Sequence, residues 1–167
     1  MPLYLSDRQN MINCIDNFLS QEDYRNVIEY CVRSPFYYGE VDSPNFPPTG
    51  MVSEISKEKY LYKLFDETIK QKIDCVKNLK IYRMYINCFA PGENPYYHID
   101  GQGITCLYYV NPEFNINDGG ETQFLFNNES INILPISNRL CFFNADILHK
   151  ATSFRNKHRF TIAIKYN

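Results

Sequence analysis

The chain has 167 residues, of which 44% are hydrophobic and 16% aromatic, with a net charge of -2 and a pI of about 5.9. This length suits one domain with a substantial core, and the charge gives no reason to expect general binding to nucleic acid or to an anionic membrane. No apolar run approaches the roughly 18 residues of a membrane span, and no basic-then-apolar leader is apparent. We therefore expect a soluble, cytoplasmic protein whose six scattered cysteines are free thiols.

Two helices separated by a loop are expected in the first part of the chain. Residues 11–19 are typical of a short strand that leads into a helix ending near Val32, with Ser20 as the N-cap. Residues 34–50 combine prolines and glycines with four aromatic residues. This composition suits either an ordinary surface loop or an aromatic lid over a substrate groove. A second helix is expected over about 57–76, with Ser56 as its N-cap and an apolar stripe facing the core.

From residue 78 onward the pattern changes to the period of two that is typical of strands. On 80–89 an apolar face alternates with a polar and aromatic face, which indicates a strand whose second face lines a cavity or meets solvent. No helical pattern interrupts the series. We therefore expect a mainly β chain, an antiparallel sandwich or jelly roll with two N-terminal helices packed outside. The expected strands cover 80–89, 104–110, 121–126, 131–136, 139–144 and 158–166.

A histidine and an aspartate two residues apart, His98 and Asp100, are the first candidate site residues. In an extended segment they point to the same side. One imidazole and one carboxylate are two of the three ligands of a 2-His-1-carboxylate site for non-haem Fe(II). His149 follows a strand-like apolar run and is the candidate for the third ligand. Taken singly, these residues are equally compatible with ordinary surface positions.

The last expected strand supplies a candidate anion-binding residue. One of its faces is apolar, and the other carries Arg159, Thr161, Ala163 and Lys165. An arginine at the buried start of a strand needs an anionic partner, and its planar guanidinium suits a carboxylate bound through two hydrogen bonds. The alternative for Arg159 alone is a surface salt bridge.

Taken together, these motifs resemble the Fe(II)/2-oxoglutarate-dependent oxygenases, specifically the prolyl-hydroxylase-like group of the prolyl 4-hydroxylase catalytic-domain type. The resemblance implies a double-stranded β-helix within one domain of residues 1–167. Residues 1–77 would give helical support and a lid loop, and 78–167 would form the β-helix core. The chain is similar to compact members of this family in phages and marine bacteria. The motifs that carry the resemblance are His98-x-Asp100, Ile104 to Asn111, Gly119-Gly120-Glu121-Thr122-x-Phe124, Asn138 to Phe143, His149 and Arg159-x-Thr161.

The resemblance also implies roles for individual residues. The metal ligands of the family match His98, Asp100 and His149. The residue that binds the far carboxylate of 2-oxoglutarate matches Arg159, with supporting hydroxyls from Tyr109 and Thr161. The family often has another tyrosine nine residues before the first histidine, but this chain has Phe89 there. Tyr85, on the same strand face, is the candidate to replace its hydroxyl.

The implied chemistry is hydroxylation of an unactivated C–H bond, with release of succinate and CO2. It uses Fe(II), 2-oxoglutarate as cosubstrate and O2, with ascorbate as a reductant, and it requires no protein acid or base. A prolyl or other residue in a peptide or protein is the first substrate class, and a free amino acid or other small molecule is the second. Nucleic acid is disfavoured, because Lys165 stands where demethylating relatives carry a second arginine.

Two other classes of protein are alternatives to an oxygenase. One is a cupin-like metal-binding jelly roll without oxygenase activity, and the other is an interaction module on an inactive fold. A metal site that binds no 2-oxo acid has no need of Arg159, and an inactive fold usually lacks one of the ligands. Asp100 argues against the halogenating relatives, which lack this carboxylate.

Overall fold

The computed structural model describes residues 11–167, so the first ten residues of the expected domain lie outside the described part. Its helices are α2 (Gln21–Arg33) and α3 (Tyr60–Lys72), followed by a short 3-10 helix at Asp74–Val76. Its strands are β1 (Ile12–Ile15), β2 (Tyr37–Tyr38), β3 (Met51–Glu54), β4 (Ile81–Phe89), β5 (Ile104–Tyr109), β6 (Thr122–Phe126), β7 (Glu129–Ile133), β8 (Arg139–Asn144), β9 (His149–Ala151) and β10 (Arg159–Tyr166).

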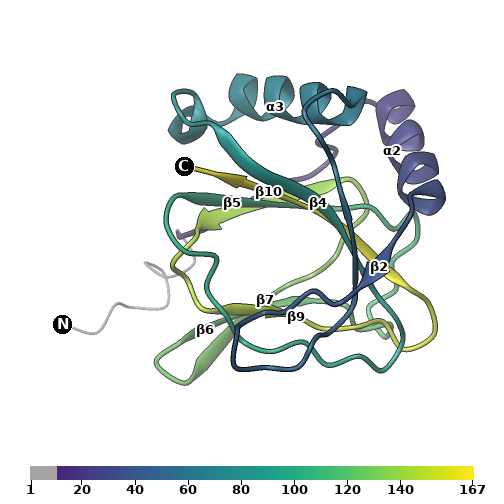
Figure 1. Ribbon diagram of the computed structural model, residues 1–167, viewed down its shortest axis with the longest axis vertical. Helices are drawn as coiled ribbons and strands as arrows, with labels where there is room; N and C mark the ends of the chain where they lie inside the picture. Colours follow the sequence, from purple (N-terminus) through teal and green to yellow (C-terminus); the bar gives the residue numbers. More distant parts are fainter. Residues whose placement is uncertain (1–10) are drawn as a thin grey trace.

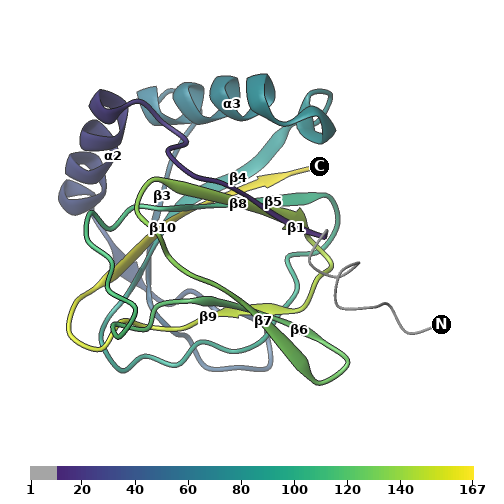
Figure 2. The ribbon, with the colours of Figure 1, turned by 180° about the vertical axis from the view of Figure 1, so that it is seen from behind.

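Two antiparallel sheets face each other, and both helices lie over the outer face of the larger sheet (Figure 1). The larger sheet has the strand order β1-β8-β5-β10-β4-β3-β2, and the smaller sheet has the order β7-β6-β9. Seen from behind, the smaller sheet again lies on the side of the larger sheet away from α2 and α3 (Figure 2). The described chain is therefore mainly β, with the antiparallel jelly-roll architecture that its pattern predicted.

The larger sheet has an apolar core on each face, because alternate residues of its strands point to opposite sides. Phe65 of α3, Ile86 of β4 and Ile162 of β10 belong to the core beneath the helices. Tyr85 of β4 and Phe124 of β6 belong to the core between the sheets. The alternation predicted for β4 and β10 is confirmed, and the face of β4 that carries Tyr85 points between the sheets. All six cysteines are free thiols, as expected.

Residues 11–77, expected to supply one short strand, two helices and a loop, supply three strands of the larger sheet, of which β1 is the expected one. β1 pairs with β8, while β3 pairs with β4 and carries β2 at the opposite edge. The sequence did not reveal β3 or β9, because strands of four and three residues are too short to show an alternating pattern.

The two helices differ in how well their boundaries were predicted. α2 begins as expected, because the Oγ atom of Ser20 accepts a hydrogen bond from the N–H of Asp23 at 3.1 Å. The N-cap predicted for α3 is wrong. The N–H of Lys59 donates to the carbonyl of Ser56 at 3.0 Å in a turn, so the helix begins only at Tyr60. Neither of these described helices is long and apolar enough to cross a membrane.

Candidate active site

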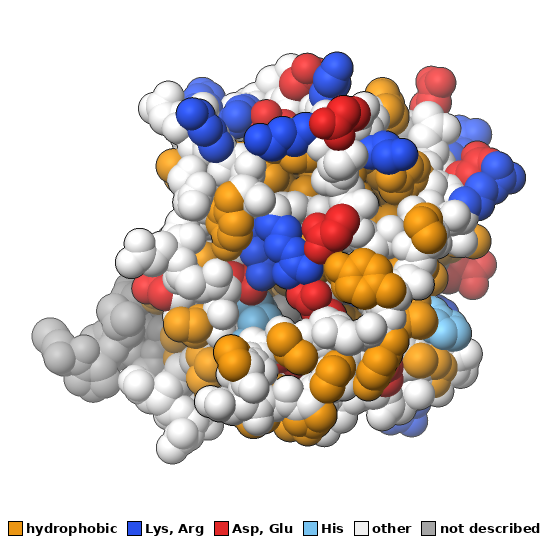
Figure 3. All heavy atoms as spheres, viewed as in Figure 1, with side chains coloured by type: hydrophobic (Ala, Val, Ile, Leu, Met, Phe, Trp, Pro, Cys, Tyr) orange, Lys and Arg blue, Asp and Glu red, His pale blue; other side chains and the backbone are white. Residues whose placement is uncertain are grey.

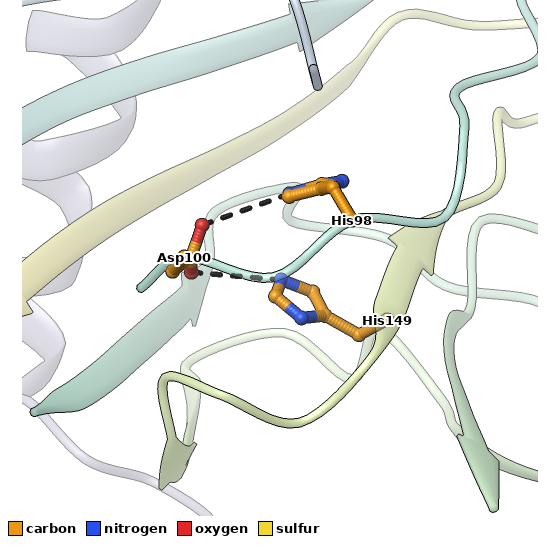
Figure 4. Close-up of side chains that lie close together, drawn as sticks. All are labelled: His98, Asp100 and His149. Atoms are coloured by element: carbon orange, nitrogen blue, oxygen red, sulfur yellow. Dashed lines mark ion pairs between the residues drawn. The ribbon is translucent and has the colours of Figure 1, made fainter. Parts of the chain in front are cut away.

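His98 and Asp100 lie on an irregular segment that runs beside β9, the strand that begins with His149. His98 and His149 form an isolated antiparallel bridge, in which the N–H of each residue donates to the carbonyl of the other at 2.9 and 3.0 Å. The N–H of Asp100 donates to the carbonyl of Ala145 at 2.8 Å. These backbone bonds bring one side-chain atom each of His98, Asp100 and His149 within 4.8 Å of one another. The two rings and the carboxylate point toward a common position (Figure 4).

Both imidazole rings are held in the orientation that a metal requires. The Nδ1 atom of His98 lies 3.0 Å from the carbonyl oxygen of Tyr96, and that of His149 lies 2.8 Å from the carbonyl oxygen of Ile147. A carbonyl only accepts hydrogen bonds, so each Nδ1 carries the proton and each Nε2 presents a lone pair. Each Nε2 atom lies 3.6 Å from an oxygen of Asp100. Two lone pairs and a carboxylate facing one position fit a divalent cation such as Fe(II).

Two further side chains hold Asp100, and the sequence did not indicate either contact. The Oγ1 atom of Thr105 and the Nζ atom of Lys165 each donate to a different oxygen of Asp100, both at 2.7 Å. Burial alone raises the pKa of Asp100, but the neighbouring His149 and Lys165, together with the hydrogen bonds from Lys165 and Thr105, outweigh burial and hold this pKa below its ordinary value. Asp100 is therefore an ionised carboxylate at neutral pH, as a metal ligand must be.

A cavity between the two sheets contains the three donors. The space-filling view shows it as a hollow with a histidine in its floor, surrounded by basic, acidic and apolar side chains (Figure 3). The polar face of β4 therefore lines a cavity, one of the two outcomes that its alternation predicted. The cavity walls include Tyr85, Asn87 and Phe89 of β4, Arg159, Thr161 and Lys165 of β10, and residues 40–42 of the loop after β2.

Arg159 is a buried cation with neutral partners. Its exposed fraction is 2%. Its Nε donates to the carbonyl of Gly120 at 2.8 Å, its Nη2 to Thr122 at 3.0 Å and its Nη1 to Thr161 at 3.4 Å. Within residues 11–167, no carboxylate forms an ion pair with this guanidinium. A buried charge without a counter-ion is costly, so the position suits an anion such as a carboxylate of 2-oxoglutarate.

The Gly119-Gly120 turn supplies one of the hydrogen-bond acceptors of Arg159. Both glycines have positive φ angles, 78° and 85°, and the turn directs the carbonyl of Gly120 to the guanidinium. A Cβ atom at Gly120 would lie 2.4 Å from the ring of Phe154, so only glycine fits at this position.

The remaining predicted residues occupy two kinds of position. Tyr85 and Thr161 line the cavity, and burial raises the pKa of the Tyr85 hydroxyl to about 12. Tyr109 is buried outside the cavity lining, with its ring 5.6 Å from the guanidinium carbon of Arg159. Its hydroxyl donates to Thr122 at 2.8 Å. Thr122, which the sequence did not indicate as a site residue, therefore connects Tyr109 with Arg159.

Comparisons with known proteins agree with this arrangement. The family model described as the 2OG-Fe(II) oxygenase superfamily matches residues 84–166, about half of the chain. A prolyl hydroxylase from Trichoplax adhaerens, solved with a hypoxia inducible factor oxygen degradation domain peptide, has a TM-score of 0.77 and 22% identity over 95% of this chain and 84% of that chain. A prolyl-4-hydroxylase from Pseudomonas putida has a TM-score of 0.76 and 15% identity, over 94% and 92% of the two chains. No curated protein matches the sequence significantly.

The fold and the site together define a jelly-roll oxygenase with a candidate non-haem metal centre. The chain belongs to the 2OG-Fe(II) oxygenase superfamily, and its fold is prolyl-hydroxylase-like. It is a 2-oxoglutarate-dependent dioxygenase, and its family uses Fe(II), 2-oxoglutarate and O2.

Proposed function

We propose that this dioxygenase hydroxylates a prolyl or other residue in a peptide or protein, with release of succinate and CO2. One observation carries the proposal. A single cavity contains a convergent His-Asp-His set and a buried arginine without an ion-pair partner among the described residues. These groups match the two requirements of the chemistry, a metal site with open positions and an anchor for a dicarboxylic cosubstrate.

Each side chain has a defined task in this proposal. His98 and His149 hold Fe(II) through Nε2, and Asp100 holds it through a carboxylate oxygen. The bound metal supplies the activation of O2 that oxidative decarboxylation of 2-oxoglutarate requires. Arg159 binds the far carboxylate of the cosubstrate, while Thr161 orients the guanidinium.

Exposed apolar residues at the mouth of the cavity favour a substrate with apolar side chains. Val41 and Ile99 line the cavity and are also 45% and 54% exposed. Exposed apolar side chains beside a polar, charged interior suit an apolar group such as a proline ring that enters from a longer chain. Two similar solved structures are prolyl hydroxylases, and one of them was determined with a peptide.

The proposal is tested by succinate formation in the presence of Fe(II), 2-oxoglutarate and ascorbate. The substrates to compare are proline-containing peptides, free amino acids and methylated oligonucleotides. We expect a peptide to stimulate succinate formation and to gain the mass of one oxygen atom. Stimulation by free amino acids alone would support the small-molecule alternative. Metal binding without any binding of 2-oxoglutarate would instead indicate a cupin-like protein.

Tyr109→Phe is expected to weaken 2-oxoglutarate binding by about tenfold or less, because it removes one neutral hydrogen-bond donor. Anaerobic titration of the Fe(II)-loaded protein with 2-oxoglutarate measures this affinity. Tyr108→Phe is a matched control, because Tyr108 is the next residue on β5 and its hydroxyl donates to Asn138 at 2.8 Å in the other core. An equal loss of affinity in both variants would contradict a specific role for Tyr109.

Replacing Tyr37 and Tyr38 together with alanine is expected to lower coupled hydroxylation and to spare uncoupled 2-oxoglutarate turnover. Tyr37 and Tyr38 form β2 at the edge of the larger sheet and are 53% and 64% exposed, so their rings are available to stack on a peptide. Tyr60→Ala is the control, because Tyr60 of α3 is similarly exposed, at 59%. Both rates and the melting temperature are measured for each variant. Equal loss of both rates, together with a lower melting temperature, would make residues 34–50 an ordinary loop.

A further inference from the structure

The loop between β2 and β3, residues 39–50, is attached to the segment that carries the first candidate metal ligand. The N–H of Gly50 donates to the carboxylate of Glu93 at 3.0 Å. The rings of Phe46 and Tyr96 are stacked, with their centres 4.3 Å apart and their planes inclined by 5°. The loop is therefore packed against the site and contacts it at several points.

Asp42 is the residue of this loop that reaches the metal site. Its side chain is only 9% exposed, although it lies on a loop. One carboxylate oxygen accepts hydrogen bonds from the N–H of Tyr96 at 2.7 Å and from the hydroxyl of Thr49 at 3.2 Å. The other oxygen lies 3.4 Å from the Nδ1 atom of His98. Such a buried carboxylate requires partners, and one of them is the ring of a candidate metal ligand.

Asp42 acts on His98 in two ways. Its negative charge lies beside Nδ1 and favours the tautomer in which this nitrogen carries the proton. Asp42 also fixes the Tyr96 residue, whose N–H donates to it and whose carbonyl accepts from Nδ1 at 3.0 Å. Both contacts fix the ring of His98 so that its Nε2 atom faces Asp100, 3.6 Å away. The structure gives His149 only the carbonyl of Ile147 as a hydrogen-bond partner for Nδ1.

We propose that Asp42 is a positioning residue, which orients His98 and thereby strengthens metal binding. This inference rests on the proposed role of His98 as a metal ligand. Removing a residue that holds a metal-binding histidine in place typically lowers metal affinity or activity by about 10- to 100-fold. Glu40 and Val41 of the same loop line the cavity, so the loop that forms part of its wall also sets the metal affinity.

The test is a titration of Co(II), an oxygen-stable substitute for Fe(II) with visible d–d absorption bands. Asp42→Asn removes the negative charge but keeps an oxygen that can accept from the N–H of Tyr96. We expect the Kd for Co(II) to rise about tenfold and the d–d bands to shift, because the orientation of a ligand changes. Glu93→Gln is the matched control. It neutralises the other carboxylate that joins the loop to this segment and does not touch His98, so its Kd and bands are expected to match the unchanged protein.

The outcomes separate the positioning role from the metal site itself. Failure of the unchanged protein to bind Co(II), or binding that survives His98→Ala, would overturn the proposed metal site. Binding that requires His98 but is equally strong in Asp42→Asn would leave the metal site standing and overturn the role of Asp42. Equal losses in Asp42→Asn and Glu93→Gln would also overturn it, because loop attachment alone would then explain the effect. Melting curves verify that each variant is folded, and Asp42→Ser replaces Asp42→Asn if that variant does not fold.

Discussion

His149→Ala is expected to reduce succinate formation to the background level while the protein remains folded. The substitution removes one of three convergent donors, and two ligands are too few to hold the metal in the facial arrangement. Burial lowers the pKa of His149, so the protein presents a neutral imidazole whose Nε2 lone pair is available at neutral pH. Succinate formation, bound iron and the melting temperature are the three measurements.

The third histidine provides the control for this variant. His158 is exposed on the turn before β10, and its ring lies beside Phe160. His158→Ala is expected to retain full activity and full iron content. Full activity in His149→Ala would remove this residue from the metal site. A loss of stability large enough to unfold the variant is not expected, although the ring packs against Phe143 at 4.8 Å between ring centres.

Arg159→Ala is expected to weaken 2-oxoglutarate binding by about 10- to 150-fold, which corresponds to roughly 1.5–3 kcal/mol for a charge-assisted, bidentate contact. The guanidinium is buried, and its hydrogen-bond partners among residues 11–167 are all neutral, so an incoming carboxylate would be its counter-ion. Anaerobic titration of the Fe(II)-loaded variant with 2-oxoglutarate measures the loss.

Two further variants make the Arg159 experiment specific. Arg159→Lys keeps the charge but not the planar fork, so its affinity is expected to lie between those of the unchanged protein and Arg159→Ala. Arg139→Ala is the control, because Arg139 of β8 already pairs with Asp16, at 2.6 Å, and does not line the cavity. Unchanged affinity in Arg159→Ala would leave the metal site in place and remove the assignment of Arg159 to the cosubstrate.

Structural features that depend on only a few neighbouring residues could be predicted from the sequence alone. Alternation separates the core face of β10 from the face with Arg159, and a side chain of the right type at Ser20 caps α2. The spacing of His98 and Asp100, together with the apolar run before His149, indicated a shared site, and the structure brings these donors together. The alternation and the cap could be predicted because strand period and helix capping depend on neighbouring residues.

Contacts between distant segments were decided only by the tertiary structure. Lys165 lies against Asp100 because β10 pairs with β5 in a register that places Lys165 opposite Thr105, the other residue that holds this carboxylate. Asp42 reaches His98 because the loop after β2 packs across the cavity. No local pattern predicts either contact, since both depend on strand register and on which faces the folded chain buries, and these are set by the packing of the whole domain.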